Sequence, residues 1–367
     1  MVLTFVDRIH NVPYLQTPTE PNISSPKSVN FSEDGKKVYI NSLEGFQTLI
    51  FDADSRERIG IISHDFDTDK GKPVEGAFSN SGKFLWIPYY RWQSDTYGNY
   101  ASSVAIVDTI KQKVVKLFET GLISKNIAIS PMNNFAAVTN WGENTVTLLN
   151  IKGDNPSDFS YNSTLVIKNK FSLFSDKPVN HDLNCDLCAR GVLFSPDEKT
   201  LLVGMSGENG IAGFDIPTKK FLGIIAGKNI LARDLTLSPN KKDLYISSNG
   251  GGTIERVKLS NLISALYATY GKTISRPELF DEVVVGGLPR TLKLTSDGKY
   301  AFVALNSSAE VVAIDTVTFK IVARIKGDSF LVGLDISPDN KWIWTTSQGH
   351  AGVGGGNAVD IFSVEYK

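Results

Sequence analysis

One short motif recurs seven times along the chain: an apolar run ends in Ser or Thr, a turn follows, and a second apolar run begins. Two of the clearest copies are Val-Asn-Phe-Ser-Glu-Asp-Gly-Lys at 29–36 and Leu-Lys-Leu-Thr-Ser-Asp-Gly-Lys at 292–299. The hydroxyl residues, separated by 47, 51, 65, 43, 57 and 42 residues, are Ser32, Ser79, Ser130, Ser195, Ser238, Thr295 and Ser337. A shortest period near 42 is typical of one β-propeller blade. Because a repeat determines the whole fold, it also determines which residues can meet at one site.

Each copy predicts four short strands, which in the sixth copy cover 291–294, 300–305, 310–315 and 320–325. The last copy ends after its third strand at 358–364, and residues 3–10 resemble the missing outer strand. Closure of the ring by this N-terminal strand would leave only short, protected sheet edges. The sequence therefore predicts an all-β fold, a seven-bladed β-propeller forming one domain over 1–367. Its blades would begin near residues 26, 73, 124, 189, 232, 289 and 331.

The copies resemble the YVTN-repeat family of seven-bladed propellers, which are similar to lactonase-like and surface-layer-type propellers. The resemblance is carried by Leu-Pro-Arg at 288–290, Thr-Ser-Asp-Gly-Lys-Tyr-Ala-Phe-Val at 295–303 and Val-Val-Ala-Ile-Asp-Thr at 311–316. It covers nearly the whole chain and implies the fold. It also implies an extracytoplasmic location, periplasmic or at the cell surface. Function has to be argued from the site, since this architecture serves many activities.

Composition narrows the partners and the compartment only a little. The net charge of −1 gives no global attraction to nucleic acid or acidic membranes, so an anion preference would need a local cluster of cations. No apolar run approaches the roughly 20 residues of a membrane span. The first residues, 1–5, lack the charged and apolar regions of a secretion signal, which fits a cytoplasmic protein or a mature chain after signal removal.

Basic residues recur at one register position of the repeat. Counting back five residues from each motif hydroxyl gives Lys27, Val74, Lys125, Arg190, Arg233, Arg290 and Val332. Each lies where the chain enters an innermost strand, so five cations should converge at one mouth of the channel and focus a positive field there. An Arg at this position also recurs in the family that the chain resembles. The pattern predicts an anion-binding mouth; the alternative is that these cations pair with neighbours such as Asp234 or Glu75 and connect the blades.

Four insertions interrupt the period, and topology places three of them at the same mouth: 88–103, 172–189 and 349–357. The fourth, 261–272, has apolar residues at helical spacing and should lie on the opposite face. Trp92 and Trp141 fall on the mouth face, where exposed rings could stack on a ligand or could pack the long loops against their own blades.

A second candidate site is the run His181-Asp182-Leu183-Asn184-Cys185-Asp186-Leu187-Cys188. Its histidine and two cysteines could supply three ligands to Zn or Cu, with His350 as the fourth. Alternatively, Cys185 and Cys188 form a local disulfide or remain free thiols. No other cofactor is expected.

The leading hypothesis is a non-catalytic, monomeric propeller that binds an anionic small molecule, glycan or protein segment at this basic, aromatic mouth. The second is a lactonase-like hydrolase acting on a sugar lactone or related acid, in which the arginines hold the anion and Glu75 or His181 activates water. The third is a metal-binding or redox role. Common catalytic motifs such as Gly-x-Ser-x-Gly and His-Glu-x-x-His are absent from the sequence.

Overall fold

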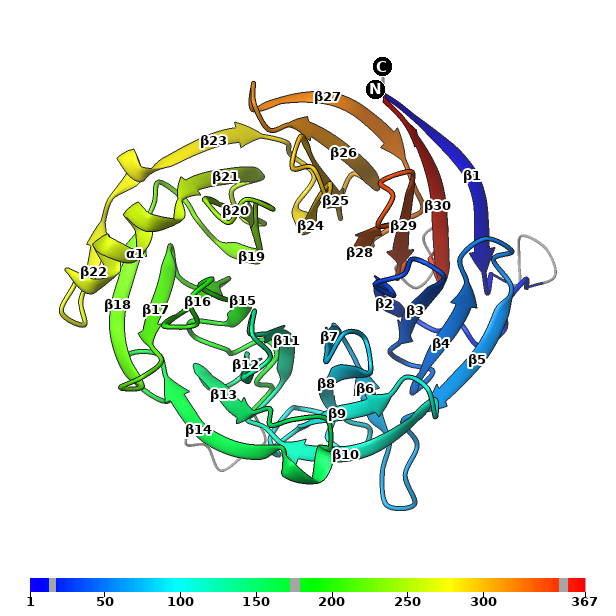
Figure 1. Cartoon of the computed structure of the whole chain (residues 1–367), viewed down its shortest axis with the longest axis horizontal. Helices are drawn as coiled ribbons and strands as arrows, with labels where there is room; N and C mark the ends of the chain where they lie inside the picture. The colour runs from blue at the N-terminus through cyan, green and yellow to red at the C-terminus, as the bar shows by residue number, and fades with distance from the viewer. Residues whose placement is uncertain (13–17, 172–178, 350–355, 367) are drawn as a thin grey trace.

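Seven β-sheets surround a central channel in the computed structural model, which describes residues 1–12, 18–171, 179–349 and 356–366 (Figure 1). Each sheet is one blade, and its strands follow the chain from the channel outward, except that the outermost strand of the last blade comes from the N-terminus. The predicted seven-bladed propeller is confirmed.

The first three blades are made of the following strands: β2 (Pro26–Phe31), β3 (Lys37–Ser42), β4 (Gln47–Asp52) and β5 (Arg58–Ser63); β6 (Gly71–Pro73), β7 (Ala77–Ser79), β8 (Phe84–Trp92), β9 (Ser103–Asp108) and β10 (Lys113–Glu119); β11 (Ser124–Ile129), β12 (Phe135–Asn140), β13 (Thr145–Asn150) and β14 (Ser160–Val166). The short 3₁₀ turn η1 (Pro156–Asp158) precedes β14.

The remaining blades are made of β15 (Ala189–Phe194), β16 (Thr200–Met205), β17 (Ile211–Asp215) and β18 (Lys220–Ala226); β19 (Ala232–Leu237), β20 (Asp243–Ser248), β21 (Thr253–Lys258) and β23 (Phe280–Val284); β24 (Pro289–Leu294), β25 (Tyr300–Leu305), β26 (Glu310–Asp315) and β27 (Lys320–Lys326); β28 (Leu331–Ile336), β29 (Trp342–Ser347), β30 (Ala358–Glu365) and β1 (Val2–His10).

The motif hydroxyl fixes the turn between the first two strands of a blade. In six copies it accepts a hydrogen bond from the backbone N–H five residues later; Thr295 Oγ1, for example, accepts from the Tyr300 N–H at 3.1 Å. In the second copy Ser79 Oγ instead accepts from the Trp86 indole N–H at 2.9 Å. In all seven copies the third residue after the hydroxyl has a φ between 57° and 79°, as at Gly35, Gly298 and Asn340. Gly and Asn adopt this left-handed conformation at low cost, which explains their use in the motif.

Hydrophobic side chains fill the spaces between blades. The described residues form seven buried clusters, and each cluster joins two neighbouring blades. Trp344 of β29, for example, is 1% exposed and packs on Phe31 and Phe51 of the first blade. Every blade therefore buries both faces, which stabilises the sheets only if the ring is closed.

The N-terminal strand closes the ring, as predicted. β1 pairs antiparallel with β30, from Val2 opposite Glu365 to His10 opposite Ala358 (Figure 1). Across this pair, Arg8 Nε lies 2.5 Å from Oδ1 of the fully buried Asp360. The edge of the last blade is thus covered by strand and ion pair together.

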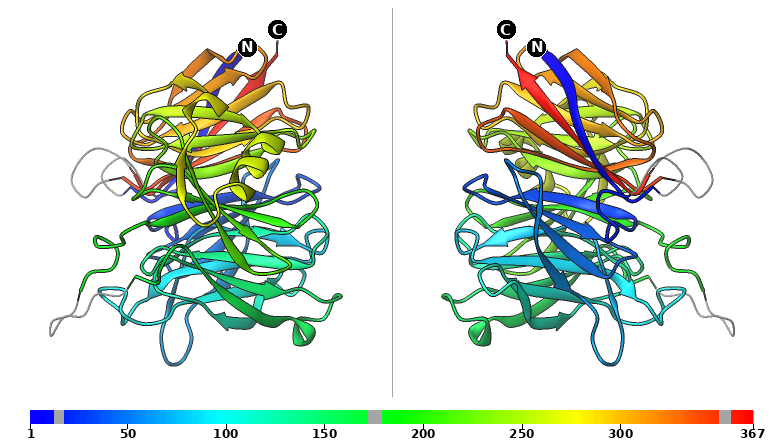
Figure 2. Two further views of the ribbon diagram at one scale, coloured as in Figure 1. Left: turned by 90° about the vertical axis from the view of Figure 1, so that its left-hand side faces the viewer. Right: turned by 90° about the vertical axis from the view of Figure 1, so that its right-hand side faces the viewer.

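Two insertions differ in detail from the prediction. β8 continues through Trp92 and pairs with β6, so the segment predicted as a loop from residue 88 begins as strand. In the fourth insertion, helix α1 (Leu259–Tyr267) begins two residues early and buries Leu262 and Leu266. The chain then forms β22 (Thr273–Ser275), which pairs parallel with β18 of the preceding blade, and a 3₁₀ turn, η2 (Pro277–Leu279). α1 lies on one side of the disc, and the loop before β15 lies on the other (Figure 2).

Among the described residues, no helix is long and apolar enough to cross a membrane.

We expect Thr295→Val to lower the free energy of unfolding by about 1–3 kcal/mol, because this isosteric change leaves the Tyr300 N–H at the turn without its hydroxyl acceptor. Thr295→Ser, which keeps the hydroxyl, serves as the control and should lose less. Equilibrium urea unfolding measures both, and a valine variant as stable as the wild type would contradict the role of the hydroxyl.

Candidate functional site: the basic channel mouth

Five basic residues occupy the same position in five blades, and we call them the cation ring: Lys27, Lys125, Arg190, Arg233 and Arg290. Each is the second residue of an innermost strand. Arg190 is 5% exposed and Lys27 is 8% exposed. The sequence-predicted convergence is therefore present in the structure, and it takes place in a desolvated environment.

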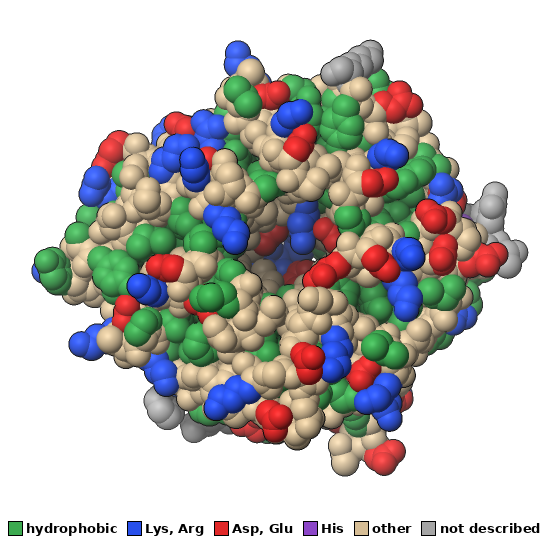
Figure 3. Space-filling model, in the orientation of Figure 1, with side chains coloured by type: hydrophobic (Ala, Val, Ile, Leu, Met, Phe, Trp, Pro, Cys, Tyr) green, Lys and Arg blue, Asp and Glu red, His purple; other side chains and the backbone are tan. Residues whose placement is uncertain are grey.

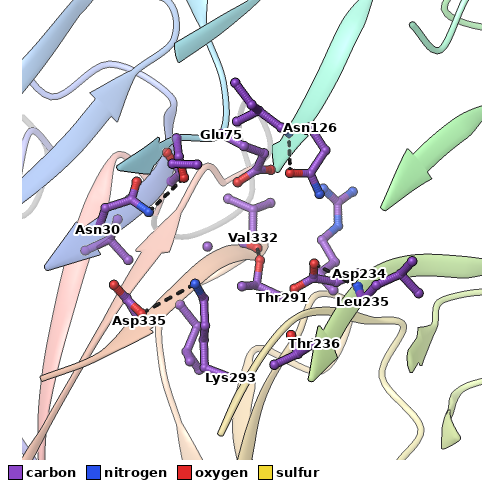
Figure 4. A pocket seen from close by; sticks show the side chains of 18 of the residues that line it. Asn30, Glu75, Asn126, Asp234, Leu235, Thr236, Thr291, Lys293, Val332 and Asp335 are labelled. Atoms are coloured by element: carbon purple, nitrogen blue, oxygen red, sulfur yellow. Dashed lines mark hydrogen bonds and ion pairs between the residues drawn. The ribbon is translucent and has the colours of Figure 1, made fainter. Parts of the chain in front are cut away.

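The three arginines line a channel cavity of about 310 Å³. Deeper in the channel, its wall carries Glu75, Asp234, Asn126 and Thr291, which project from four different blades (Figure 4). On the α1 side, the channel is visible as a central hollow with both basic and acidic side chains in its wall (Figure 3).

Only part of the ring is neutralised by carboxylates. Arg190 Nη2 forms an ion pair with Glu75 Oε1 at 2.9 Å, and its Nη1 donates to the Lys125 carbonyl at 3.0 Å. The Nε atoms of Arg190, Arg233 and Arg290 are buried and have no hydrogen-bond partner within the described part of the chain. The alternative in which acidic neighbours neutralise the ring thus applies to Arg190, while Asp234 accepts backbone N–H groups of Leu235 and Leu292 instead.

Lys125 is held by an acidic and aromatic cluster at the outer end of the mouth. Its Nζ lies 2.8 Å from Asp182 Oδ1, 4.0 Å from the centre of the Tyr90 ring and 5.0 Å from that of Trp141. Trp141 also donates its indole N–H to the Asp182 carbonyl at 3.0 Å and lies 5.8 Å from the Arg233 guanidinium. The loop before β15 thus supplies a counter-charge, and Trp141 lies between two ring cations.

Burial and mutual repulsion lower the pKa values of four residues of the cation ring. Burial, opposed by Asp182 and assisted by Arg190, lowers the pKa of Lys125 to about 7. Burial together with Arg290 and Arg190 lowers the pKa of Lys27 well below its ordinary value. Burial together with Arg290 and Arg190 also lowers the pKa of Arg233 well below its ordinary value. Burial and Arg190 lower the pKa of Arg290 to about 10. A site that disfavours its own positive charges in this way favours the arrival of an anion.

A second charged layer lies deeper in the channel. Lys293 Nζ is 3.6 Å from Asp335 Oδ1, and this carboxylate raises the pKa of the lysine (Figure 4). Asp335 also accepts the Phe31 N–H at 2.8 Å. This lysine is therefore already paired, as Arg190 is with Glu75, whereas Arg233 and Arg290 have no ion-pair partner among the described residues.

The other sequence-predicted residues are distributed as follows. Trp92 packs against Phe66 and Tyr89 within the second blade, and its described contacts do not include the cation ring. His181 is 6% exposed, and its Nδ1 lies 3.1 Å from the Gly142 carbonyl. His350 lies outside the described residues.

Cys185 and Cys188 are joined by a disulfide, with their Cα atoms 4.9 Å apart. This is one of the alternatives that the sequence left open, and it removes the two thiolates that a Zn or Cu site would use. Among the described residues, no group of three or more His, Cys, Asp or Glu side chains is placed to hold a metal ion. A metal site at His181, Cys185 and Cys188 would require reduction first.

Sequence reasoning did not anticipate the roles of Tyr90 and Asp182. Both belong to segments that the sequence places at the mouth, but neither shows the repeat periodicity that reveals the cations. Their contact with Lys125 depends on how two separate insertions fold over the third blade.

No family model and no curated protein matches this chain significantly, so the YVTN-repeat resemblance is not confirmed. Solved structures do share the fold. A hydrazine synthase chain from Kuenenia stuttgartiensis is 16% identical with a TM-score of 0.64, over 93% of this chain and 96% of that one. The Cps50 (Swd1) β-propeller domain of Myceliophteria thermophila is 12% identical with a TM-score of 0.70, over 99% of this chain and all of that domain. At these identities the likeness shows the propeller fold alone.

The disulfide predicts that Cys185 and Cys188 resist alkylation. Denatured protein treated with iodoacetamide should gain no label without reductant and two labels after reduction, as measured by intact mass. Two labels without reductant, or stoichiometric zinc or copper by elemental analysis, would contradict the disulfide.

The depressed pKa of Lys125 predicts a pH-dependent stability. Between about pH 7 and 9.5, the unfolded chain holds a proton that the folded lysine has released, so the free energy of unfolding should rise with pH. Lys125→Met should reduce this slope. Lys293→Met should not, because the pKa of Lys293 is raised and neither state loses its proton in that window. Urea unfolding at several pH values measures the slopes, and equal slopes for wild type and Lys125→Met would contradict the pKa.

Proposed function

We propose that this protein is a binding propeller that takes up an anionic group at the cation ring. The observation that carries the proposal is that Arg190, Arg233 and Arg290 line one cavity, and that each has a buried Nε donor with no hydrogen-bond partner among the described residues. Each buried donor that is left unpaired costs about 1–3 kcal/mol. An anion that accepts hydrogen bonds from several of these donors removes this cost, and the free energy gained contributes to its affinity.

The balance of charge supports the same conclusion. Within the described residues, two carboxylates pair directly with the ring, Glu75 with Arg190 and Asp182 with Lys125, and Arg233 and Arg290 form no ion pair. Arginine offers a planar fork of donors that suits carboxylate and phosphate oxygens. An anion bound here would supply the counter-charge that the protein itself does not.

The size of the cavity bears on the choice of ligand. About 310 Å³ is at the lower end of small-molecule pockets. This volume favours a small anion, or the anionic end of a glycan or protein segment, over a long occupant. Trp141 and Tyr90 provide ring faces next to the cations, against which the remainder of such a ligand can pack.

The lactonase-like alternative draws less support from the same geometry. A hydrolase would need Glu75 or His181 as a general base. Glu75 lines the cavity, but its carboxylate holds Arg190, and His181 does not line the cavity. We therefore favour binding without catalysis.

We further propose an extracytoplasmic location. The Cys185–Cys188 disulfide supports it, since disulfides persist in oxidising compartments.

The decisive variant replaces Arg190, Arg233 and Arg290 by Ala. We expect calorimetric titration to show binding of inorganic phosphate or lactate by the wild type, weakened with rising salt, and at least tenfold weaker binding by the variant. A charge-matched control replaces the exposed Lys113, Lys241 and Lys320 by Ala and should bind like the wild type. Thermal melting confirms that both variants fold. If the triple arginine variant binds these anions as the wild type does, or if neither anion binds the wild type, the proposal fails.

A further inference from the structure

Lys27 differs from Lys125 and Lys293 in forming no ion pair with a carboxylate of the described residues. Lys125 is paired with Asp182 and Lys293 with Asp335. Within the described chain, Lys27 Nζ makes no hydrogen bond and no ion pair, although its side chain is buried and only 8% of the residue is exposed. A buried and unpaired lysine on the second residue of an innermost strand needs a chemical explanation.

The surroundings of Lys27 favour the neutral amine. Its electrostatic neighbours are Arg290, Arg190 and Arg233, which disfavour a further positive charge, and Glu75, whose carboxylate is already paired with Arg190. Burial acts in the same direction and is the larger cause of the lowered pKa. A desolvated lysine beside other cations is the recognised way in which a protein obtains a nucleophilic amine at neutral pH.

The arginines supply the second half of a reactive site. Ser28, the neighbour of Lys27 in the chain, lines the same cavity as Arg190, Arg233 and Arg290, so a carboxylate held by these arginines would lie beside the strand that carries Lys27. In a 2-oxo acid the carbonyl carbon is bonded directly to the carboxylate carbon, so the same contact brings an electrophile to the ring. A compound of three or four carbons is also compatible with a cavity of about 310 Å³.

We propose that the anion is a 2-oxo carboxylate and that Lys27 captures it as an imine. The inference rests on the proposed function, because it uses the same arginines to hold the carboxylate. The lone pair of Nζ forms the new C–N bond at the carbonyl carbon, and the π pair of the carbonyl moves to its oxygen. That oxygen then leaves as water with the two hydrogens of the amine, and the C=N bond remains. The step is reversible and requires no oxidant or reductant.

The test is reductive trapping with pyruvate as the probe. Wild-type protein is incubated with pyruvate and sodium cyanoborohydride, which reduces the imine to a stable secondary amine, and its peptides are mapped by mass spectrometry. We expect the carboxyethyl adduct on Lys27 and at least tenfold less on Lys293, which acts as the internal control because it is paired with Asp335 and its pKa is raised. Excess lactate, which has the carboxylate but no carbonyl, should suppress the adduct. Acetone, which has the carbonyl but no carboxylate, should not form it at the same concentration.

Two variants separate capture from carboxylate binding. Lys27→Arg keeps a basic side chain and should abolish the adduct, because a guanidinium does not form the imine, and lactate affinity is read from the wild type. Arg233→Ala with Arg290→Ala keeps Lys27 and should reduce both the adduct and lactate affinity at least tenfold. Mapping of the wild type needs no variant, so the test does not depend on either variant folding.

The outcomes distinguish the two proposals. Lactate binding without trapping, or equal labelling of Lys27 and Lys293, would overturn the imine and leave the anion site intact. Neither binding of lactate or phosphate nor trapping would overturn both.

Discussion

The structure depends on one hydrogen bond repeated around the ring, from a backbone N–H to the hydroxyl five residues before it. This bond fixes the turn between the two innermost strands of a blade and therefore the register in which they pair. Because a strand alternates its side chains, a slip of one residue would exchange channel-facing and blade-facing positions. In the six blades that have this bond, the position five residues before the hydroxyl is consequently the same place, the second residue of the innermost strand. A local turn thus determines which side chains meet at the channel mouth.

The second constraint is closure. Each of the seven buried clusters joins two blades, so each blade depends on both neighbours for the burial of its apolar faces. A ring held in this way can tolerate unfavourable charge at its centre, since the like charges of the cation ring are fixed by strands that pack elsewhere. The pairing of β1 with β30 completes the arrangement, and Trp344 packs across the interface that this closure brings together.

Contacts between residues close in the sequence could be predicted from it, whereas contacts between distant segments could not. The turn motif is local, and the predicted strands 300–305 and 310–315 coincide with β25 and β26. The convergence of five cations followed from the register alone. Glu75, which follows register position 74, was among the partners that the sequence offered, and it pairs with Arg190. The partner of Lys125 could not be predicted in this way, because Asp182 is 57 residues away and lies in an insertion that lacks the repeat period. Trp92 shows the same limit: the extension of β8 beyond its predicted end, paired with β6, places it among the rings of its own blade.

The composition of the ring has a consequence that neither register nor closure explains. A desolvated group of cations can lower its energy by pairing with carboxylates, by releasing protons or by binding an anion. Glu75 and Asp182 provide the first route for Arg190 and Lys125. The second route is available to lysine far more readily than to arginine, whose guanidinium retains its proton in proteins. Deprotonation therefore falls mainly on the lysines, since the pKa values of both Lys27 and Lys125 are lowered. For the arginines, the remaining way to lower the energy is to bind an anion. In the proposed function, one ring would combine fixed positive charges that hold an anion with an amine that reacts with it, and the difference between arginine and lysine would separate these roles.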